Sequence, residues 1–263
     1  LNRIWDVGRY TMHMSMLDHF VDCPWRERTL YGGDVYAENL IAHYAFGDPR
    51  MNRKCLRQMF AIQYDEGALP PYGPYRGCDG FYPAWSAYWG LAFADHYRLT
   101  GDENFLRELW PAFCRLLDWT IGQLEANENG LMGAPGKRLK FNEWMAAEKV
   151  GFSPSDNFPF QVLLRRGAEL ADRLEDADAT RRFTAAADAL TDALMKHLVD
   201  LETGMVTHGI KGQRHRSGQY HAGLLLWSGL PDEGWGRRVA HGLFEPETSR
   251  IGAPFHALFV NEG

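Results

Sequence analysis

The sequence alternates between two kinds of helical segment, and this alternation constrains the fold more than any other feature. Segments such as 102–126 carry apolar residues at three- and four-residue spacing with charges between them, the pattern of a helix with one face in water. Segments such as 83–99 are apolar nearly all round, the pattern of a helix enclosed by others. The enclosed kind is expected near 33–46, 83–99, 157–174, 217–229 and 253–263; the one-faced kind is expected at about 1–17 and near 50–63, 102–126, 177–199 and 231–244.

The links between these segments are short and long in turn. Each link from an enclosed to a one-faced segment is short and contains residues suited to a helix end or a helix start, namely Gly47-Asp48-Pro49, Thr100-Gly101-Asp102, Glu175-Asp176 and Gly229-Leu230-Pro231. The return links are long and rich in Gly, Pro and aromatic residues: 18–32, 64–82, 127–156, 200–216 and 245–252. Strands are expected only as short pieces of these loops, for example around Gly204–Ile210.

Alternating inner and outer helices with tight turns at one end predict an all-α fold, an α/α toroid of the (α/α)6 type. We expect one toroidal domain over 1–263 that is incomplete at its C-terminus, because the fifth enclosed segment reaches Gly263 and a closed ring needs more chain. The chain is therefore expected to be a piece of a longer multidomain protein. A functional site is expected on the face of the long loops, because loops on a rigid scaffold carry binding and catalysis. The alternative is a helical-repeat scaffold without an active site.

Composition excludes several classes of protein. Hydrophobic residues make up 45% and charged residues 24%, as in ordinary globular domains, and no apolar run reaches the roughly 18 to 20 residues of a membrane span. The net charge is −6 without a basic cluster, which argues against nucleic-acid binding. The four cysteines and the histidines show neither a disulfide framework nor zinc-ligand spacing, and no metal or cofactor is expected. Aromatic residues reach 13%, many of them in loops, where they either stack on sugars or pack the loops.

The first long loop is the most informative stretch of the chain. It reads Asp22-Cys23-Pro24-Trp25-Arg26-Glu27-Arg28-Thr29-Leu30-Tyr31-Gly32-Gly33-Asp34, with carboxylates, arginines and aromatic rings close together. In one interpretation Asp34 is a helix N-cap and arginine–carboxylate pairs brace the loop. In the other, aromatic surface favours the neutral form of Glu27, which then acts as a general acid, while one of the arginines points elsewhere, for example toward Asp22.

This loop resembles the acidic signature of bacterial α-L-rhamnosidases, the inverting glycoside hydrolases of family 78, whose catalytic domain is an (α/α)6 barrel. The family pattern is Asp-Cys-Pro-x-Arg-Glu-Arg followed by a Gly-Trp-x-Gly-Asp ending, and residues 22–28 and Gly33-Asp34 follow it. Two positions depart from it, because Tyr31 stands where the family usually has Trp and Leu30 replaces its Gly. Weaker similarity continues through 81–86, 97–102, 141–144 and 251–255.

The resemblance implies a role for each matching residue. Glu27 corresponds to the general acid. The other matches are substrate-binding residues: Asp22, Arg26 and Asp34 hold sugar hydroxyls or orient the acid, while Tyr31, Trp85 and Trp144 wall the pocket, with Glu143 beside the last of these. The partners implied are a carbohydrate substrate of the rhamnoside type and further β-rich domains of the same full-length chain.

The resemblance also implies a general base that this sequence does not contain. Inverting hydrolysis needs a second carboxylate roughly 6.5–9.5 Å from the first, and the family's base is a Glu beyond the helix that begins near Gly252. Glu143 is a weaker candidate for the base. Two other functions remain open: a non-catalytic carbohydrate-binding toroid, and a sugar epimerase or isomerase of the α/α-toroid type, for which His256 is the one late histidine at the start of an enclosed segment.

Overall fold

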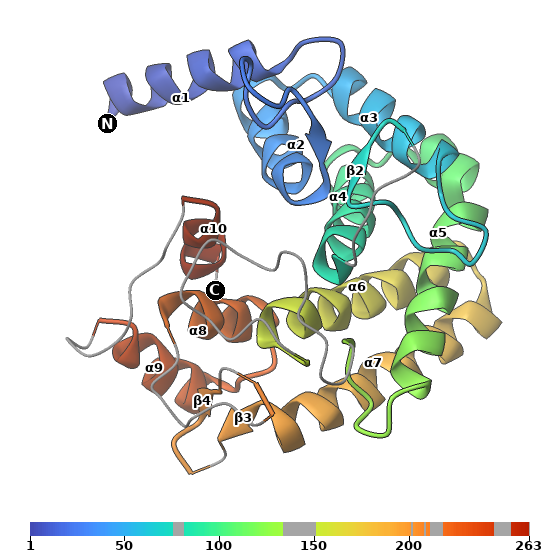
Figure 1. Cartoon of the computed structure of the whole chain (residues 1–263), viewed down its shortest axis with the longest axis vertical. Helices are drawn as coiled ribbons and strands as arrows, with labels where there is room; N and C mark the ends of the chain where they lie inside the picture. Colours follow the sequence, from blue (N-terminus) through green and yellow to red (C-terminus); the bar gives the residue numbers. More distant parts are fainter. Residues whose placement is uncertain are drawn as a thin grey trace. The chain divides into compact units, whose positions relative to one another are not determined.

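The computed structural model describes residues 1–75, 82–133, 151–200, 202–207, 209–210, 218–244 and 254–262. The described chain is mostly helical (Figure 1). Its helices are α1 (Asn2–Ser15), α2 (Gly32–Phe46), α3 (Arg50–Ala61), α4 (Pro83–Thr100), α5 (Glu103–Glu125), α6 (Pro154–Arg173), α7 (Ala177–His197), α8 (Gln219–Trp227), α9 (Glu233–Gly242) and α10 (Pro254–Glu262). Each expected helix is present, so the all-α prediction is confirmed.

Four strands of two residues each form two small antiparallel pairs. β1 (Leu30–Tyr31) pairs with β2 (Tyr72–Gly73), and β3 (Val199–Asp200) pairs with β4 (Met205–Val206). The second pair includes part of the strand expected around 204–210. The first pair was not predicted, because two residues are too few to show the alternation that identifies a strand.

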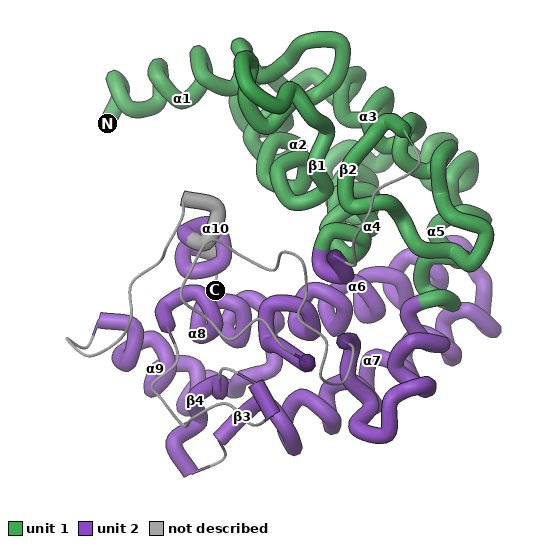
Figure 2. Tube along the Cα trace, viewed as in Figure 1, with its two compact units in different colours: residues 1–79, 85–119 green, residues 80–84, 120–263 purple. Residues whose placement is uncertain are grey.

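The chain divides into two compact units (Figure 2). Unit 1 comprises Leu1–Asp79 and Trp85–Trp119, and unit 2 comprises Gly80–Ala84 and Thr120–Gly263.

The core of unit 1 is built around α4, which is enclosed as its sequence predicts. The ring of Phe93 lies 5.5 Å from that of Phe60 on α3, and 6.1 and 5.0 Å from those of Phe105 and Phe113 on α5. Tyr88 and Trp89 are buried beside it. Aromatic rings of α3 and α5 thus cover the apolar surface of α4 around Phe93.

Unit 2 contains the later helices. α6 packs along α7, and α8 packs on α10, where the rings of Tyr220 and Trp227 lie 5.8 and 4.9 Å from Phe259. The expected turn chemistry is present, since the side chain of Asp176 accepts from the Ala179 N–H and caps α7.

The two short turns of unit 1 end and restart helices as the sequence predicts. Gly47 and Gly101 adopt left-handed conformations, with φ of 64° and 66°, and so end α2 and α4. Asp48 binds the guanidinium of Arg50 at 2.5 Å just where α3 begins.

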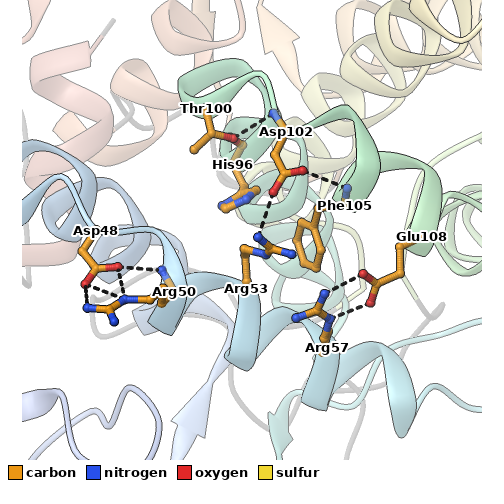
Figure 3. A network of polar contacts seen from close by, with 9 residues as sticks. All are labelled: Asp48, Arg50, Arg53, Arg57, His96, Thr100, Asp102, Phe105 and Glu108. Carbon is orange, nitrogen blue, oxygen red and sulfur yellow. Dashed lines mark hydrogen bonds and ion pairs between the residues drawn. The ribbon is translucent and has the colours of Figure 1, made fainter.

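Ion pairs join the helices at this short-turn end (Figure 3). Asp102 accepts from the Phe105 N–H at 3.0 Å, capping α5, and its other oxygen lies 3.1 Å from Arg53 on α3. Arg57 on α3 holds Glu108 on α5 by two hydrogen bonds of 2.6 Å. These pairs connect one helical hairpin to the next.

Candidate active site

The loop from Asp22 to Asp34 is closed by its own backbone and side chains. The Asp22 N–H donates to the Thr29 carbonyl at 3.1 Å, and the Thr29 N–H donates to Asp22 Oδ1 at 2.8 Å. Between them the chain turns at 24–27, and Arg28 adopts a left-handed conformation with φ of 52°. This closure presents Trp25, Arg26 and Glu27 to solvent, Trp25 with 92% of its surface exposed.

The carboxylate of Glu27 is held by Tyr31. The Tyr31 hydroxyl donates to Glu27 Oε2 at 2.8 Å, and its ring lies 5.2 Å from that of Tyr72 across the β1–β2 pair. Partial burial, followed by the hydrogen bond to Glu27 and its charge, raises the pKa of Tyr31 well above its usual value. Tyr31 therefore stays a hydrogen-bond donor, and a fixed strand pair sets the direction of the Glu27 side chain.

Asp34 lies in the first turn of α2 with a perturbed acidity. Burial, followed by the charge of Asp22, raises the pKa of Asp34 to about 6. Its expected role as N-cap is wrong, because α2 begins at Gly32 and Tyr31 is the N-cap residue. The physical reason is the preceding strand: the Gly32 N–H already donates to the Pro71 carbonyl at 3.0 Å.

The Gly32-Gly33 pair lets α4 approach the start of α2 closely. A Cβ atom on Gly32 would lie 2.6 Å from the Trp85 carbonyl oxygen and 2.7 Å from Trp89 Nε1. A Cβ atom on Gly33 would lie 3.1 Å from the ring of Trp85. The half-buried Trp85 ring therefore lies next to the residue that precedes Asp34, which brings two widely separated sequence positions into one place.

The arginines of the loop do not brace it. Within the described part of the chain, neither Arg26 nor Arg28 forms an ion pair with Asp22, Glu27 or Asp34, and both arginines are exposed. The expectation of arginine–carboxylate bracing is therefore wrong, as is that of an arginine directed to Asp22. The backbone N–H of Thr29 takes that place, because it is near enough to satisfy Asp22 without desolvating a guanidinium.

Glu143 and Trp144 lie in 134–150, outside the described residues, so their place in the site stays a prediction. Among the described residues, no group of three His, Cys, Asp or Glu side chains has the geometry of a metal site. None of the described helices is both long and apolar enough to cross a membrane.

Sequence reasoning missed Glu38, which lies one turn after Asp34 on α2 and has 9% of its surface exposed. Burial, followed by the charges of Asp34 and Asp22, raises the pKa of Glu38 to about 9. The sequence could have indicated Glu38 as a site residue, because it is an acid inside a segment predicted to be enclosed. Its spacing of four residues also places it on the same helix face as Asp34.

Comparison with known proteins identifies the fold. Residues 1–241 match the family described as bacterial alpha-L-rhamnosidase 6 hairpin glycosidase domain. The structure is similar to a rhamnosidase of glycoside hydrolase family 78 from Bacillus sp. GL1, with a TM-score of 0.86 and 24% identity over 98% of this chain and 27% of that chain. It is also similar to a rhamnosidase from Klebsiella oxytoca with rhamnose bound, with a TM-score of 0.80 and 21% identity over 94% of this chain and 48% of that chain.

A D-mannose isomerase shares the fold at lower similarity, with a TM-score of 0.61 and 12% identity over 95% of this chain and 76% of that chain. No curated protein matches the sequence. The predicted fold class, an all-α toroid of the six-hairpin type, is confirmed by the family match and by these structures. The chain spans 27% and 48% of the two rhamnosidases.

Proposed function

Because the chain belongs to the family of bacterial α-L-rhamnosidase six-hairpin glycosidase domains, we propose that it is the catalytic domain of an inverting glycoside hydrolase. Its substrates are terminal α-L-rhamnosides or related deoxyhexosides. The proposal includes further β-rich domains in the full-length chain. Family membership supports a glycosidase in general, and the particular sugar and mechanism come from the site residues.

One observation carries the mechanistic part of the proposal: the exposed carboxyl of Glu27 is oriented by Tyr31 and has no cation paired with it among the described residues. A general acid must reach the glycosidic oxygen of a bound substrate, and an exposed, oriented carboxyl meets that requirement. A carboxylate locked to an arginine would not.

In the proposed reaction, Glu27 donates its proton to the glycosidic oxygen as the bond to the anomeric carbon breaks. In the same displacement, a water molecule activated by a second carboxylate adds to the opposite face of the sugar. The proposal assigns that base to none of the described residues. The leaving group takes up the proton of Glu27, the base takes up the proton of the water, and no cofactor takes part.

The neighbouring residues bind the sugar. Asp22 and Asp34 accept hydrogen bonds from its hydroxyl groups, and Arg26 contributes a donor from the exposed side of the loop. Trp85, which lies against Gly33, offers an apolar ring to the sugar's apolar face. Tyr31 both forms part of the wall and holds the acid.

The isomerase alternative is not favoured by the described histidines. His43 and His96 form a close pair, with ring centroids 5.6 Å apart, but they lie toward the C-terminal ends of α2 and α4. The acidic loop is at the other end of α2. This pair therefore does not support proton transfer at the loop face, and the side chain of His256 lies outside the described residues, so its role stays a prediction.

The proposal is tested by incubating the full-length protein with p-nitrophenyl α-L-rhamnoside and following the first-formed sugar by proton NMR. We expect rhamnose release with inversion at the anomeric carbon. Retention of configuration contradicts the mechanism. Binding of rhamnose without any turnover supports the non-catalytic carbohydrate-binding alternative instead.

A further inference from the structure

Glu38 is a buried acid that has no role in the proposed reaction. It is 9% exposed, and its Oε2 atom is fully buried without a hydrogen-bond partner among the described residues. Burying an ionised carboxylate without a cation is strongly unfavourable. Either a neighbouring cation compensates Glu38, or it holds a proton.

The groups that act on Glu38 are acidic or neutral. Asp34 lies four residues earlier on the same face of α2, and Asp22 lies in the acidic loop; the negative charge of each acts on Glu38. From α3 comes the buried thiol of Cys55, whose Sγ accepts from the Phe20 N–H at 3.4 Å. Burial, with a contribution from Glu38, raises the pKa of Cys55 to about 12, so this thiol brings no negative charge.

Two cations of α3 are engaged elsewhere. Lys54 pairs with Asp18 at 2.6 Å, and Arg53 pairs with Asp102 at 3.1 Å. No described cation is paired with Glu38. Asp22, Asp34 and Glu38 therefore form a carboxyl cluster in which repulsion is relieved when one member is protonated, and the most deeply placed member is Glu38.

We propose that Glu38 is a positioning residue for Asp34: it remains a neutral carboxylic acid one helical turn behind Asp34, and by holding its proton it lets Asp34 and Asp22 be the ionised acceptors for the substrate's hydroxyl groups. The role assigned to Asp34 rests on the proposed function, whereas the protonated state of Glu38 does not. A neutral acid also has one O–H to donate, which an ionised one lacks.

This assignment predicts different effects of two substitutions of similar size on the titration of Asp34 and on KM. Glu38→Gln keeps a neutral donor at the same place, whereas Glu38→Leu keeps the volume and removes the donor. The matched control is Leu40→Ala, which changes a buried residue of the same helix outside the carboxyl cluster. Circular dichroism checks that every variant is folded.

The first readout is the titration of Asp34, followed by carboxyl carbon-13 NMR, which needs no catalytic activity. We expect the Asp34 midpoint to stay within about half a pH unit in E38Q and in Leu40→Ala, and to rise by about one unit in E38L, because an apolar side chain at position 38 adds to the desolvation of Asp34. A fall of one unit or more in E38Q overturns the proposal, because it means that Glu38 carries a negative charge in the native protein.

The second readout is kinetic and uses the full-length protein with p-nitrophenyl α-L-rhamnoside. We expect E38L to raise KM about tenfold and to move the acid limb of kcat/KM to higher pH, while E38Q stays within about threefold of the native KM. Native KM and acid limb in E38L overturn the positioning role. If the native protein neither binds nor hydrolyses rhamnosides, the proposed function fails, and the NMR titration still decides the state of Glu38.

Discussion

The pKa values of carboxylates are shifted in opposite directions near the two ends of α2. Just beyond its C-terminus, the hydrogen bonds from Arg50 lower the pKa of Asp48 to about 2, and between α3 and α5 those from Arg57 lower the pKa of Glu108. At its N-terminus, burial and neighbouring carboxylates raise the pKa of Asp34 and Glu38 instead. The positive end of the helix dipole should favour the charged form of Asp34, so the raised value means that desolvation and repulsion exceed that effect.

Within unit 1, the short-turn end therefore contributes to stability, and the long-loop end offers groups for function. Paired charges at the short turns join helical hairpins, and a carboxylate that is held by an arginine is not available to a ligand. Unpaired carboxyls at the long loop cost stability and are available to a ligand. Acids with perturbed pKa values that lie close together are a mark of functional sites.

Removing the acid at the loop end should have the largest effect on activity. Glu27→Gln keeps the shape and the hydrogen bond from Tyr31 but cannot donate a proton in the reaction. We expect kcat/KM on a rhamnose-containing disaccharide to fall by about 10²–10⁴-fold. Initial-rate kinetics on the full-length protein measure it.

The matched control for this variant is Glu66→Gln, an exposed glutamate on the other long loop of unit 1, which should leave kcat/KM unchanged. A comparable loss in Glu66→Gln, or native activity in Glu27→Gln, contradicts the assignment.

At the short-turn end, acid should destabilise the protein through His96. Burial, followed by the charge of neighbouring His43, lowers the pKa of His96 to about 4, and both of its ring nitrogens lack a hydrogen-bond partner among the described residues. Because the unfolded-state value is about 6.5, this contribution to stability is complete above that pH and is lost as pH falls toward 4. The loss is at most about 3 kcal/mol.

Urea unfolding at pH 7 and pH 5 measures this contribution. His96→Leu should reduce the difference in unfolding free energy between the two pH values, whereas His241→Leu, at an exposed position, should not. An unchanged difference in His96→Leu would show that other groups control the acid sensitivity.

Tyr31 should have an intermediate effect on catalysis. Tyr31→Phe keeps the ring contact with Tyr72 and removes the hydroxyl that holds Glu27. We expect kcat/KM to fall about tenfold, roughly the value of one hydrogen bond, with the unfolding free energy nearly unchanged. Tyr72→Phe is the control, and an equal loss in both variants would argue against an orienting role for the Tyr31 hydroxyl.

The smallest effect on catalysis should come from the ion pairs of the short turns. Asp102→Ala removes the cap of α5 and the partner of Arg53, and should lower the unfolding free energy by about 1–2 kcal/mol. Since these residues are at the other end of the helices, kcat/KM should stay within twofold at a temperature where the variant is folded. A tenfold loss of kcat/KM would show that the two ends are coupled.

The helices could be predicted from the sequence because their apolar residues recur with the period of an α-helix. Long segments such as 83–99 and 102–126 repeat their pattern over several turns, and their observed bounds, Pro83–Thr100 and Glu103–Glu125, differ from the expected ones by a residue. The short turns were equally clear, because Gly47 and Gly101 are needed where the backbone turns left-handed.

The site was predicted less completely, for two physical reasons. The β1–β2 pair, which fixes Tyr31 and supplies the acceptor for the Gly32 N–H, joins residues about forty positions apart through two-residue strands that have no pattern of their own. The acidity of Asp34 and Glu38 depends on burial by other segments, which periodicity does not quantify. The part that was predicted, the closeness of Asp22, Glu27, Tyr31 and Asp34, depends on a contiguous motif.

The most direct test of the account is the dependence of kcat/KM on the leaving group for the native protein and Glu27→Gln, measured with aryl α-L-rhamnosides of graded phenol acidity. If Glu27 protonates the leaving group, the variant should be much more sensitive to phenol acidity than the native protein and should approach native rates with the most acidic phenols. Parallel plots, with the same loss for every leaving group, would contradict the assignment of Glu27 as the general acid.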